Sequence, residues 1–269
     1  MLISNSNKSV HNSFINTKLQ SEHQIPSRMQ FFISNLISFG NNTNFAKGNS
    51  NTMKKIIFTL SLLGILGFLS AQTSVKIALL KYNGGGDWYA NPTSLPNLIQ
   101  FCNQNLHTNI AEEPATIEVG SSEIFNYPLV HITGHGNIVF SNQEIKNLRE
   151  YLQGGGFLHI SDNYGLDKFI RKEMKKVFPN CEFEELSTKH PMYHQKYDFN
   201  QGLPKIHEHD GKSSQGFGIY YEGRLVCFYD YECDLGDGWE DIEVHHDTEE
   251  KHQEALEMGA NIVSFVFGQ

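Results

Sequence analysis

Two short polar segments carry the side chains that are best suited to chemistry, and each directly follows an apolar run. His135 lies between two glycines, so its imidazole can approach a ligand closely, although a histidine can also simply cap a strand or a helix. Asp162 can act as a general base, orient one, bind a cation or cap its own turn. We predict that both residues serve one catalytic site. The neighbouring residues predicted to contact its ligand are Thr133, Gly134, Gly136, Ser161 and Asn163.

Three later residues are candidates for the same site. His190 precedes a proline, which holds the histidine in an extended conformation, and we predict a catalytic role for it. The alternative is an ordinary loop histidine. Asp234 and Trp239 lie in an acidic, glycine-containing segment from residue 230 to 241, and we predict that they form a wall of the site. Trp239 fits the hydrophobic core equally well.

A nucleophile or a metal ion is less well supported by the residue pattern. Ser161 follows an apolar run as the serine of a G-x-S-x-G turn does, but His159 occupies the position of the first glycine, which disfavours an acyl-enzyme mechanism. His207 and His209 would face one side of a strand, yet no third ligand follows at a suitable spacing. The sequence therefore assigns no metal ligand and no cofactor, and a solvated loop is the favoured interpretation of this histidine pair.

The two polar segments are joined by a pattern that predicts a strand, a helix and a second strand. Apolar runs cover 128–132 and 157–160. Between them, Ser141 and Glu144 have the spacing of a capping box, and an apolar stripe then leads to Gly154, which suits the left-handed conformation that ends many helices. Parallel strands joined by a helix have their carboxyl ends on one side of the sheet, which would bring the two polar segments together.

The remaining pattern predicts an α/β protein with an open, mostly parallel sheet, because short apolar runs alternate with amphipathic segments. Ligands of such sheets bind beyond the carboxyl ends of the strands. The further predicted elements are strands at 75–80, 115–119 and 182–186, a hairpin at 217–221 and 225–229, and helices at 94–106, 166–178 and from residue 248 onward.

The N-terminal part of the chain has the pattern of an export signal. Met53 and two lysines precede an apolar stretch and small residues that end at Ala71, which predicts a cleaved signal peptide at 53–71. A retained anchor is the alternative, but the apolar stretch is shorter than the roughly 20 residues that a membrane helix needs. We interpret 1–52 as an over-extended gene start or a disordered segment, and 72–269 as a single α/β domain.

Charge and cysteine content limit the partners of this domain. Residues 72–269 hold 15 basic and 29 acidic residues, a formal net charge of −14. Such a surface repels nucleic acid and anionic lipid, so neither is expected as a partner, and no stable membrane span is expected after signal cleavage. The four cysteines lack a C-x-x-C spacing. They allow one or two disulfides in an oxidising compartment, while a buried free thiol is equally consistent with Cys227.

Several separated motifs occur in one characteristic order. They are Tyr127-Pro128, Thr133 to Gly136, Leu148 to Gly156, Asp162, Phe178-Pro179, His190-Pro191, Asp234 and Gly238-Trp239. In these motifs the chain resembles bacterial domain-of-unknown-function family 4159, whose members resemble the class I glutamine amidotransferase-like fold. The resemblance implies a three-layer sandwich with a doubly wound, flavodoxin-like sheet and a site at the carboxyl ends of the strands. Residues around Ser161 replace the glutaminase cysteine of the related fold, which argues against glutamine hydrolysis.

Together these features favour an exported domain without glutaminase activity that binds a small or carbohydrate-like ligand, or a partner protein, at the carboxyl ends of the strands. The first alternative is a hydrolase with Asp162 or His190 as general base. The second is an interaction module of a cell-envelope assembly. The residues expected to build the site in common are His135, Asp162, His190 and Asp234.

Overall fold

A seven-stranded sheet with the order β2-β1-β3-β4-β7-β6-β5 organises the chain. The computed structural model describes residues 74–269, so the predicted signal peptide at 53–71 and the segment 1–52 lie outside the described residues. The first five strands in this order are parallel, whereas β6 and β5 pair antiparallel. The strands are β1 (Ala78–Lys81), β2 (Ala115–Glu118), β3 (Leu129–Ile132), β4 (Phe157–Ser161), β5 (Glu184–Glu185), β6 (Gln215–Tyr221) and β7 (Arg224–Tyr231).

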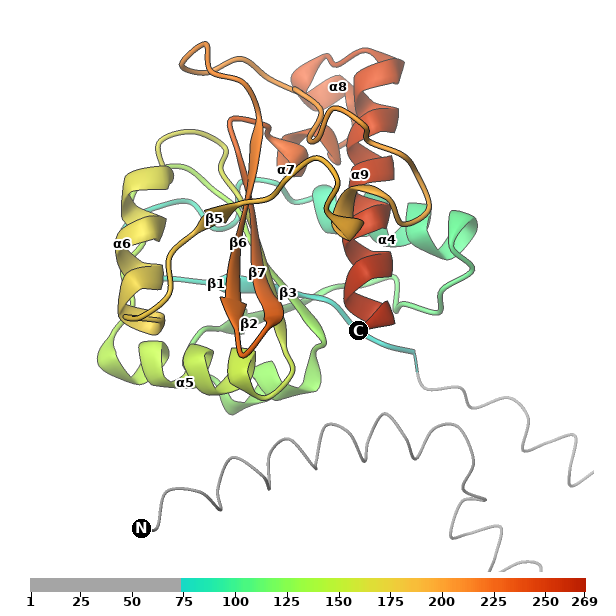
Figure 1. Cartoon of the computed structure of the whole chain (residues 1–269). Helices are drawn as coiled ribbons and strands as arrows, with labels where there is room; N and C mark the ends of the chain where they lie inside the picture. Colours follow the sequence, from blue (N-terminus) through green and yellow to red (C-terminus); the bar gives the residue numbers. More distant parts are fainter. Residues whose placement is uncertain (1–73) are drawn as a thin grey trace, which may run out of the picture. The chain divides into compact units, whose positions relative to one another are not determined.

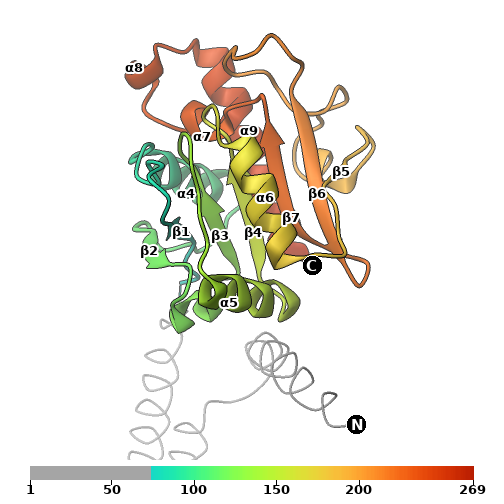
Figure 2. The same cartoon turned by 90° about the vertical axis from the view of Figure 1, so that its left-hand side faces the viewer.

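Helices cover both faces of the sheet and complete a three-layer sandwich (Figures 1 and 2). On one face, α4 (Ser94–Asn105) and α9 (Glu249–Gly268) share a buried cluster with the sheet. On the other face, α5 (Asn142–Gln153) and α6 (Asp167–Val177) build a second cluster. The predicted α/β fold is therefore confirmed, and the order β2-β1-β3-β4 followed by another parallel strand is consistent with a flavodoxin-like arrangement. The shorter helical elements are η1 (Ser122–Asn126), η2 (Pro191–Tyr193), α7 (Leu235–Gly238) and α8 (Ile242–His245).

Local hydrogen bonds explain where α5 begins. The backbone amide of Glu144 donates to the Ser141 hydroxyl at 3.3 Å, and the backbone amide of Ser141 donates to the Glu144 carboxylate at 2.6 Å. Both groups of the predicted capping box are thus present, and they satisfy amides that the helix itself leaves without a partner. The helix ends differently from the prediction, because the left-handed residue is Gly155, with φ of 112°, rather than Gly154.

The acidic segment from residue 230 to 241 contains a single helical turn, α7, which is not among the elements that the sequence predicted. Its glycines serve close packing more than chain flexibility. A Cβ at Gly238 would lie 2.6 Å from the Cβ of Ala255 in α9, and a Cβ at Gly236 would lie 3.2 Å from the Ser161 hydroxyl. Because glycine is a poor helix former, the sequence gives little local sign of this turn.

The described part of the chain has no disulfide, and all four cysteines are free thiols, with Cys227 buried in β7. No helix among residues 74–269 combines the length and the apolar character that crossing a bilayer requires.

Candidate functional site

The loops that follow β1, β3, β4 and β7, which we call the carboxyl-end loops, lie on one side of the sheet. Because β3 and β4 are parallel neighbours in which Ile132 pairs with Ile160, the residues that follow them meet at the same end. His135 and Asp162 therefore share this end, as the sequence predicted. Figure 2 shows α7 and α8 at this end, while α9 runs away from it and places the C-terminus at the other end.

A buried polar network closes the centre of the carboxyl-end loops. The Thr133 hydroxyl lies 2.8 Å from both Asn91 Oδ1 and Asn163 Oδ1, and Asn163 Nδ2 lies 2.5 Å from Asn91 Oδ1. Asn91 also donates from Nδ2 to Asp237 Oδ1 at 2.5 Å. Thr133 and Asn163, both predicted ligand contacts, are thus engaged with each other through Asn91, and the network fixes one oxygen of Asp237.

Asp162 is buried and serves its own turn. Its Oδ1 accepts hydrogen bonds from the backbone amides of Tyr164 and Leu166 at 3.0 and 2.9 Å, and its Oδ2 accepts from the Tyr229 hydroxyl at 3.0 Å. Burial raises the pKa of Asp162 above its ordinary value, although these three donors act in the opposite direction. The contacts identify Asp162 as the residue that shapes the β4–α6 turn.

His135 forms an exposed pair with Asp87, which follows β1. Asp87 Oδ1 accepts from the backbone amide of His135 at 2.5 Å, and Oδ2 lies 3.0 Å from His135 Nδ1. Burial raises the pKa of Asp87, but the hydrogen bonds from His135 outweigh it and hold the pKa below its ordinary value. The ionised carboxylate fixes the proton on Nδ1 and leaves Nε2 as the basic nitrogen. Gly134 allows this close approach, because its φ is 130° and a Cβ would lie 2.4 Å from the Tyr82 hydroxyl.

Ser161 is an internal hydrogen-bonding residue. Its hydroxyl donates to Asp230 Oδ1 at 3.0 Å and accepts from the backbone amide of Gly236 at 2.9 Å. Asp230 Oδ2 lies 2.9 Å from His159 Nε2, and His159 Nδ1 lies 3.0 Å from His131 Nδ1. This series of buried hydrogen bonds runs from β3 across β4 and β7 and ends at the first turn of α7. It fixes α7 relative to β4.

Two predicted site residues lie elsewhere. The His190 side chain accepts from the Met192 amide at 3.1 Å, and its ring lies 5.6 Å from that of Phe265 near the end of α9. Phe265 in turn contacts Phe157, the first residue of β4, so His190 lies toward the amino end of the strand. Trp239 is 1% exposed and belongs to the hydrophobic core. The structure therefore does not bring His190 to the carboxyl-end loops.

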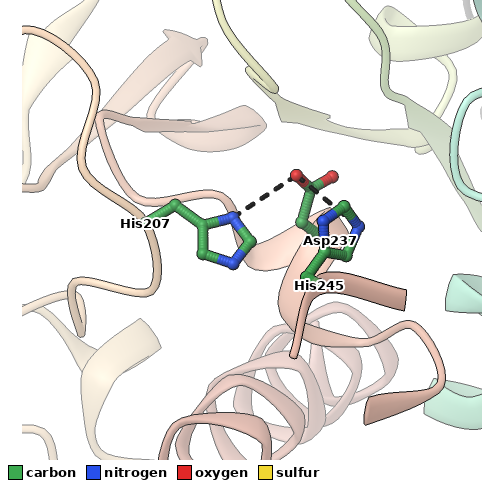
Figure 3. Close-up of side chains that lie close together, drawn as sticks. All are labelled: His207, Asp237 and His245. Atoms are coloured by element: carbon green, nitrogen blue, oxygen red, sulfur yellow. Dashed lines mark ion pairs between the residues drawn. The ribbon is translucent and has the colours of Figure 1, made fainter. Parts of the chain in front are cut away.

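A cluster of histidines and one carboxylate occurs instead beside α7 (Figure 3). The cluster consists of His207, Asp237 and His245, and one ligand atom of each lies within 4.8 Å of the others. Asp237 Oδ2 lies between the two imidazoles, 3.4 Å from His207 Nδ1 and 3.8 Å from His245 Nε2. Adjacent ligand atoms of a tetrahedral zinc ion are about 3.4 Å apart, given bonds of about 2.1 Å. We call these three residues the metal-ligand cluster.

Outer hydrogen bonds orient two of these ligands. His207 Nε2 lies 3.1 Å from both carboxylate oxygens of Asp247, which holds a proton on Nε2, so loss of the second proton from Nδ1 would leave that nitrogen free to bind a cation. The bond from Asn91 occupies Asp237 Oδ1 and leaves Oδ2 for a cation. Carboxylates that orient a metal-binding histidine in this way are typical of zinc sites.

The surroundings of the metal-ligand cluster are strongly acidic. Asp234, which is fully buried, lies 3.3 Å from His207 Nδ1 and 2.5 Å from His209 Nε2, while Glu240 lies 3.2 Å from His245 Nε2. Hydrogen bonds to Asp234 and Asp237 outweigh burial and raise the pKa of His207 to about 10. A metal ion therefore has to displace a proton from this histidine. Asp234 Oδ1 is buried without a hydrogen-bond partner among the described residues.

The sequence pattern had shown only part of this cluster. His207 and His209 were visible as a pair, but Asp237 lies 30 residues after His207 and His245 a further eight. The one available signal was the density of acidic residues near the histidines of the 230–250 segment. Two imidazoles and one carboxylate suit Zn²⁺ or another divalent transition metal, and three protein ligands leave a coordination position for water or a ligand.

Comparison with known proteins gives one family. The family model described as "Domain of unknown function (DUF4159)" matches residues 76–267, which include every strand of the sheet. The resemblance indicated by the sequence motifs is thereby confirmed. No curated protein matches the chain.

Proposed function

The chain belongs to the DUF4159 family, and since that family has no assigned activity, we propose from the geometry that the domain binds a divalent transition-metal ion and uses it to hold a small-molecule ligand. The metal-ligand cluster carries this proposal. Its three residues come from three segments, namely the loop before β6, α7 and α8, and each side chain directs a suitable atom to one point. Zn²⁺ fits best, because it accepts mixed nitrogen and oxygen ligands in a tetrahedral arrangement.

The experiment is a zinc titration of the metal-free protein by calorimetry, together with substitution of one ligand. His245→Asn removes a ligand, and we expect zinc affinity to fall at least tenfold. His246→Asn is the matched control, because His246 is the exposed neighbour and its φ of 57° suits asparagine. Equal zinc affinity of the two variants, or no zinc binding by the unchanged protein, contradicts the proposal.

A hydrolase is a second candidate, and the Asp87–His135 pair favours it. The strand order reverses between β1 and β3, and in open α/β sheets ligands bind outside this point. Asp87 and His135 follow these two strands and form an imidazole oriented by a carboxylate, which is the arrangement of a general base. In this version His135 takes the role first considered for Asp162 and His190. Release of p-nitrophenol from neutral nitrophenyl esters by the zinc-loaded protein tests it, with His135→Gln expected to abolish turnover and retain zinc.

Export remains part of the proposal and rests on the pattern of residues 53–71. Expression in a bacterium with an outer membrane should give a periplasmic product whose N-terminus, measured by mass spectrometry, is Gln72. A product that keeps Met53 contradicts signal cleavage. A role as a cell-envelope interaction module predicts co-purification of an envelope protein, while a protein that remains alone after mild cross-linking contradicts that role.

A further inference from the structure

We infer that the domain has a further ligand site, a cavity of about 350 Å³ beside α6 that binds a small monocarboxylate with an apolar chain or ring. This inference goes beyond the proposed metal site and does not depend on it, because α6 covers the face of the sheet opposite α4 and α9. The evidence consists of the side chains that line the cavity, the charge that they leave unmatched and the fixed position of one arginine.

The cavity is lined by apolar side chains together with basic ones. Its walls come from α6, from the segment that follows α6 and from β6. The apolar side chains belong to Met174, Phe183 and Ile219, and the basic ones to Arg171, Lys172 and Lys175. Its volume lies near the lower limit of small-molecule sites, which span roughly 300–1,000 Å³. These features suit a small ligand that has an anionic group at one end and an apolar body at the other.

The charges around the cavity match a single negative charge on the ligand. Lys175 forms an ion pair with Glu182, and Arg171 Nε donates to Asp167 at 2.6 Å. Lys172 has no ion pair and no hydrogen bond within residues 74–269. The three cations and two carboxylates leave one positive charge, which one carboxylate balances. A phosphate group carries more than one negative charge at neutral pH, and the net charge of −14 on residues 72–269 would repel the excess.

The guanidinium of Arg171 is held in place before a ligand binds. Its central carbon lies 4.4 Å from the ring centroid of Phe217 and 5.4 Å from that of Phe183. The bond to Asp167 uses Nε, so the two Nη groups remain as donors. A planar guanidinium presents such N–H groups in the geometry of a carboxylate, and a side chain that is already ordered loses less entropy on binding. Arg171 therefore favours a carboxylate as the anionic group.

Cys181 provides a direct measurement of ligand binding, because it lines the cavity and is half-buried. The other three cysteines are buried, so alkylation of the folded protein by the neutral reagent N-ethylmaleimide reports on Cys181. The probes are hexanoate and phenylacetate. They are compared with hexanamide, which lacks the charge, with acetate, which lacks the chain, and with inorganic phosphate. We expect hexanoate and phenylacetate to slow alkylation at least fivefold at saturation, at concentrations at least tenfold lower than hexanamide or acetate requires.

One substitution tests the unmatched charge. Lys172→Gln should raise the hexanoate concentration needed for half-maximal protection about threefold to fivefold, as loss of an exposed ionic contact does. Lys168→Gln is the matched control, because it makes the same change of charge in the same helix. Lys168 is exposed and its ammonium group lies over the ring of Phe169, outside the cavity, so its substitution should leave protection unchanged.

Each contrary outcome removes a stated part of the inference. Absence of protection by either carboxylate at tens of millimolar overturns the site. Hexanamide or acetate that protects as well as hexanoate overturns the need for both a charge and an apolar body, and phosphate that protects at lower concentration than hexanoate overturns the ligand class. Equal hexanoate protection of Lys172→Gln and Lys168→Gln contradicts binding in this cavity.

Discussion

His131, the buried histidine of β3, should make the free energy of unfolding depend on pH. His131 is 2% exposed, and its Nδ1 lies 3.0 Å from His159 Nδ1. Its Nε2 is buried and has no hydrogen-bond partner within residues 74–269. Burial lowers the pKa of His131 from 6.5 to about 3. The histidine therefore stays neutral in the folded protein at pH values at which the unfolded chain takes up a proton.

The sign of the effect on stability follows from this difference. Between pH 6.5 and about 3 the unfolded chain binds the extra proton, so the free energy of unfolding falls as the pH falls through this window. The unfolded histidine is already half protonated at pH 6.5, and each further pH unit corresponds to at most about 1.4 kcal/mol, so His131 alone should cost about 2.3 kcal/mol between pH 6.5 and 4.5. Burial lowers the pKa of His159 and raises the pKa of its partner Asp230, so the two shifts act on the pH dependence of stability in opposite directions.

The assay is urea denaturation at constant ionic strength from pH 7 to pH 4.5, for the unchanged protein and for His131→Asn. Asparagine can still donate to His159 and does not titrate, so the free energy of unfolding should depend less steeply on pH by up to about 1.4 kcal/mol per unit. The cavity left by the substitution lowers stability at every pH, and for this reason the slope is compared rather than the value. His107→Asn is the control, since His107 is exposed with a φ of 56°. An unchanged slope for His131→Asn would refute the reasoning.

Three further substitutions test single contacts. Asp247→Asn should weaken zinc binding about tenfold to a hundredfold in a calorimetric titration, because it removes the carboxylate that orients His207. Asp198→Asn is the control, since Asp198 contacts His194 outside the cluster, and it should leave zinc binding unchanged. Gly259→Ala should lower the free energy of unfolding by about 1–3 kcal/mol in urea, because its Cβ would lie 2.5 Å from Leu98 Cδ1. Ser141→Ala should cost about 1 kcal/mol in the same measurement through loss of the cap of α5, and an unchanged midpoint contradicts that role.

The fold could be predicted because its signals are local. Ser141 and Glu144 are three residues apart, and the apolar runs that become β3 and β4 are each read from a few neighbouring positions. The same local pattern placed His135 and Asp162 at one end of the sheet, since consecutive parallel strands leave no other arrangement. The pattern could not show that the Asp162 carboxylate, although well placed, would accept hydrogen bonds from the backbone amides of the turn that follows it.

The metal-ligand cluster could not be read from spacing, because its geometry depends on packing between distant segments. The segment that carries His207 has no regular structure, and it is held in place by contacts such as the bond from the Ile206 amide to the Cys233 carbonyl. The position of His190 has a similar cause, because its ring packs on Phe265, 75 residues later. A sequence pattern gives the order of such segments but not the end of the sheet at which each one comes to lie.

The buried polar residues at the strand ends are hydrogen-bonded to α7, and α7 carries one residue of the metal-ligand cluster. The Ser161 hydroxyl accepts a hydrogen bond from the Gly236 amide. Asn91, which accepts a hydrogen bond from the Thr133 hydroxyl, donates one to the Asp237 carboxylate. These residues are buried and engaged with one another, so they cannot also contact a substrate. Their effect is to set the position and rotation of α7, a single turn of helix that carries one ligand and has little stability of its own. In the proposed metal site, these buried strand-end residues would support α7, and the metal-ligand cluster lies one layer further out, where Asp237 meets the two histidines.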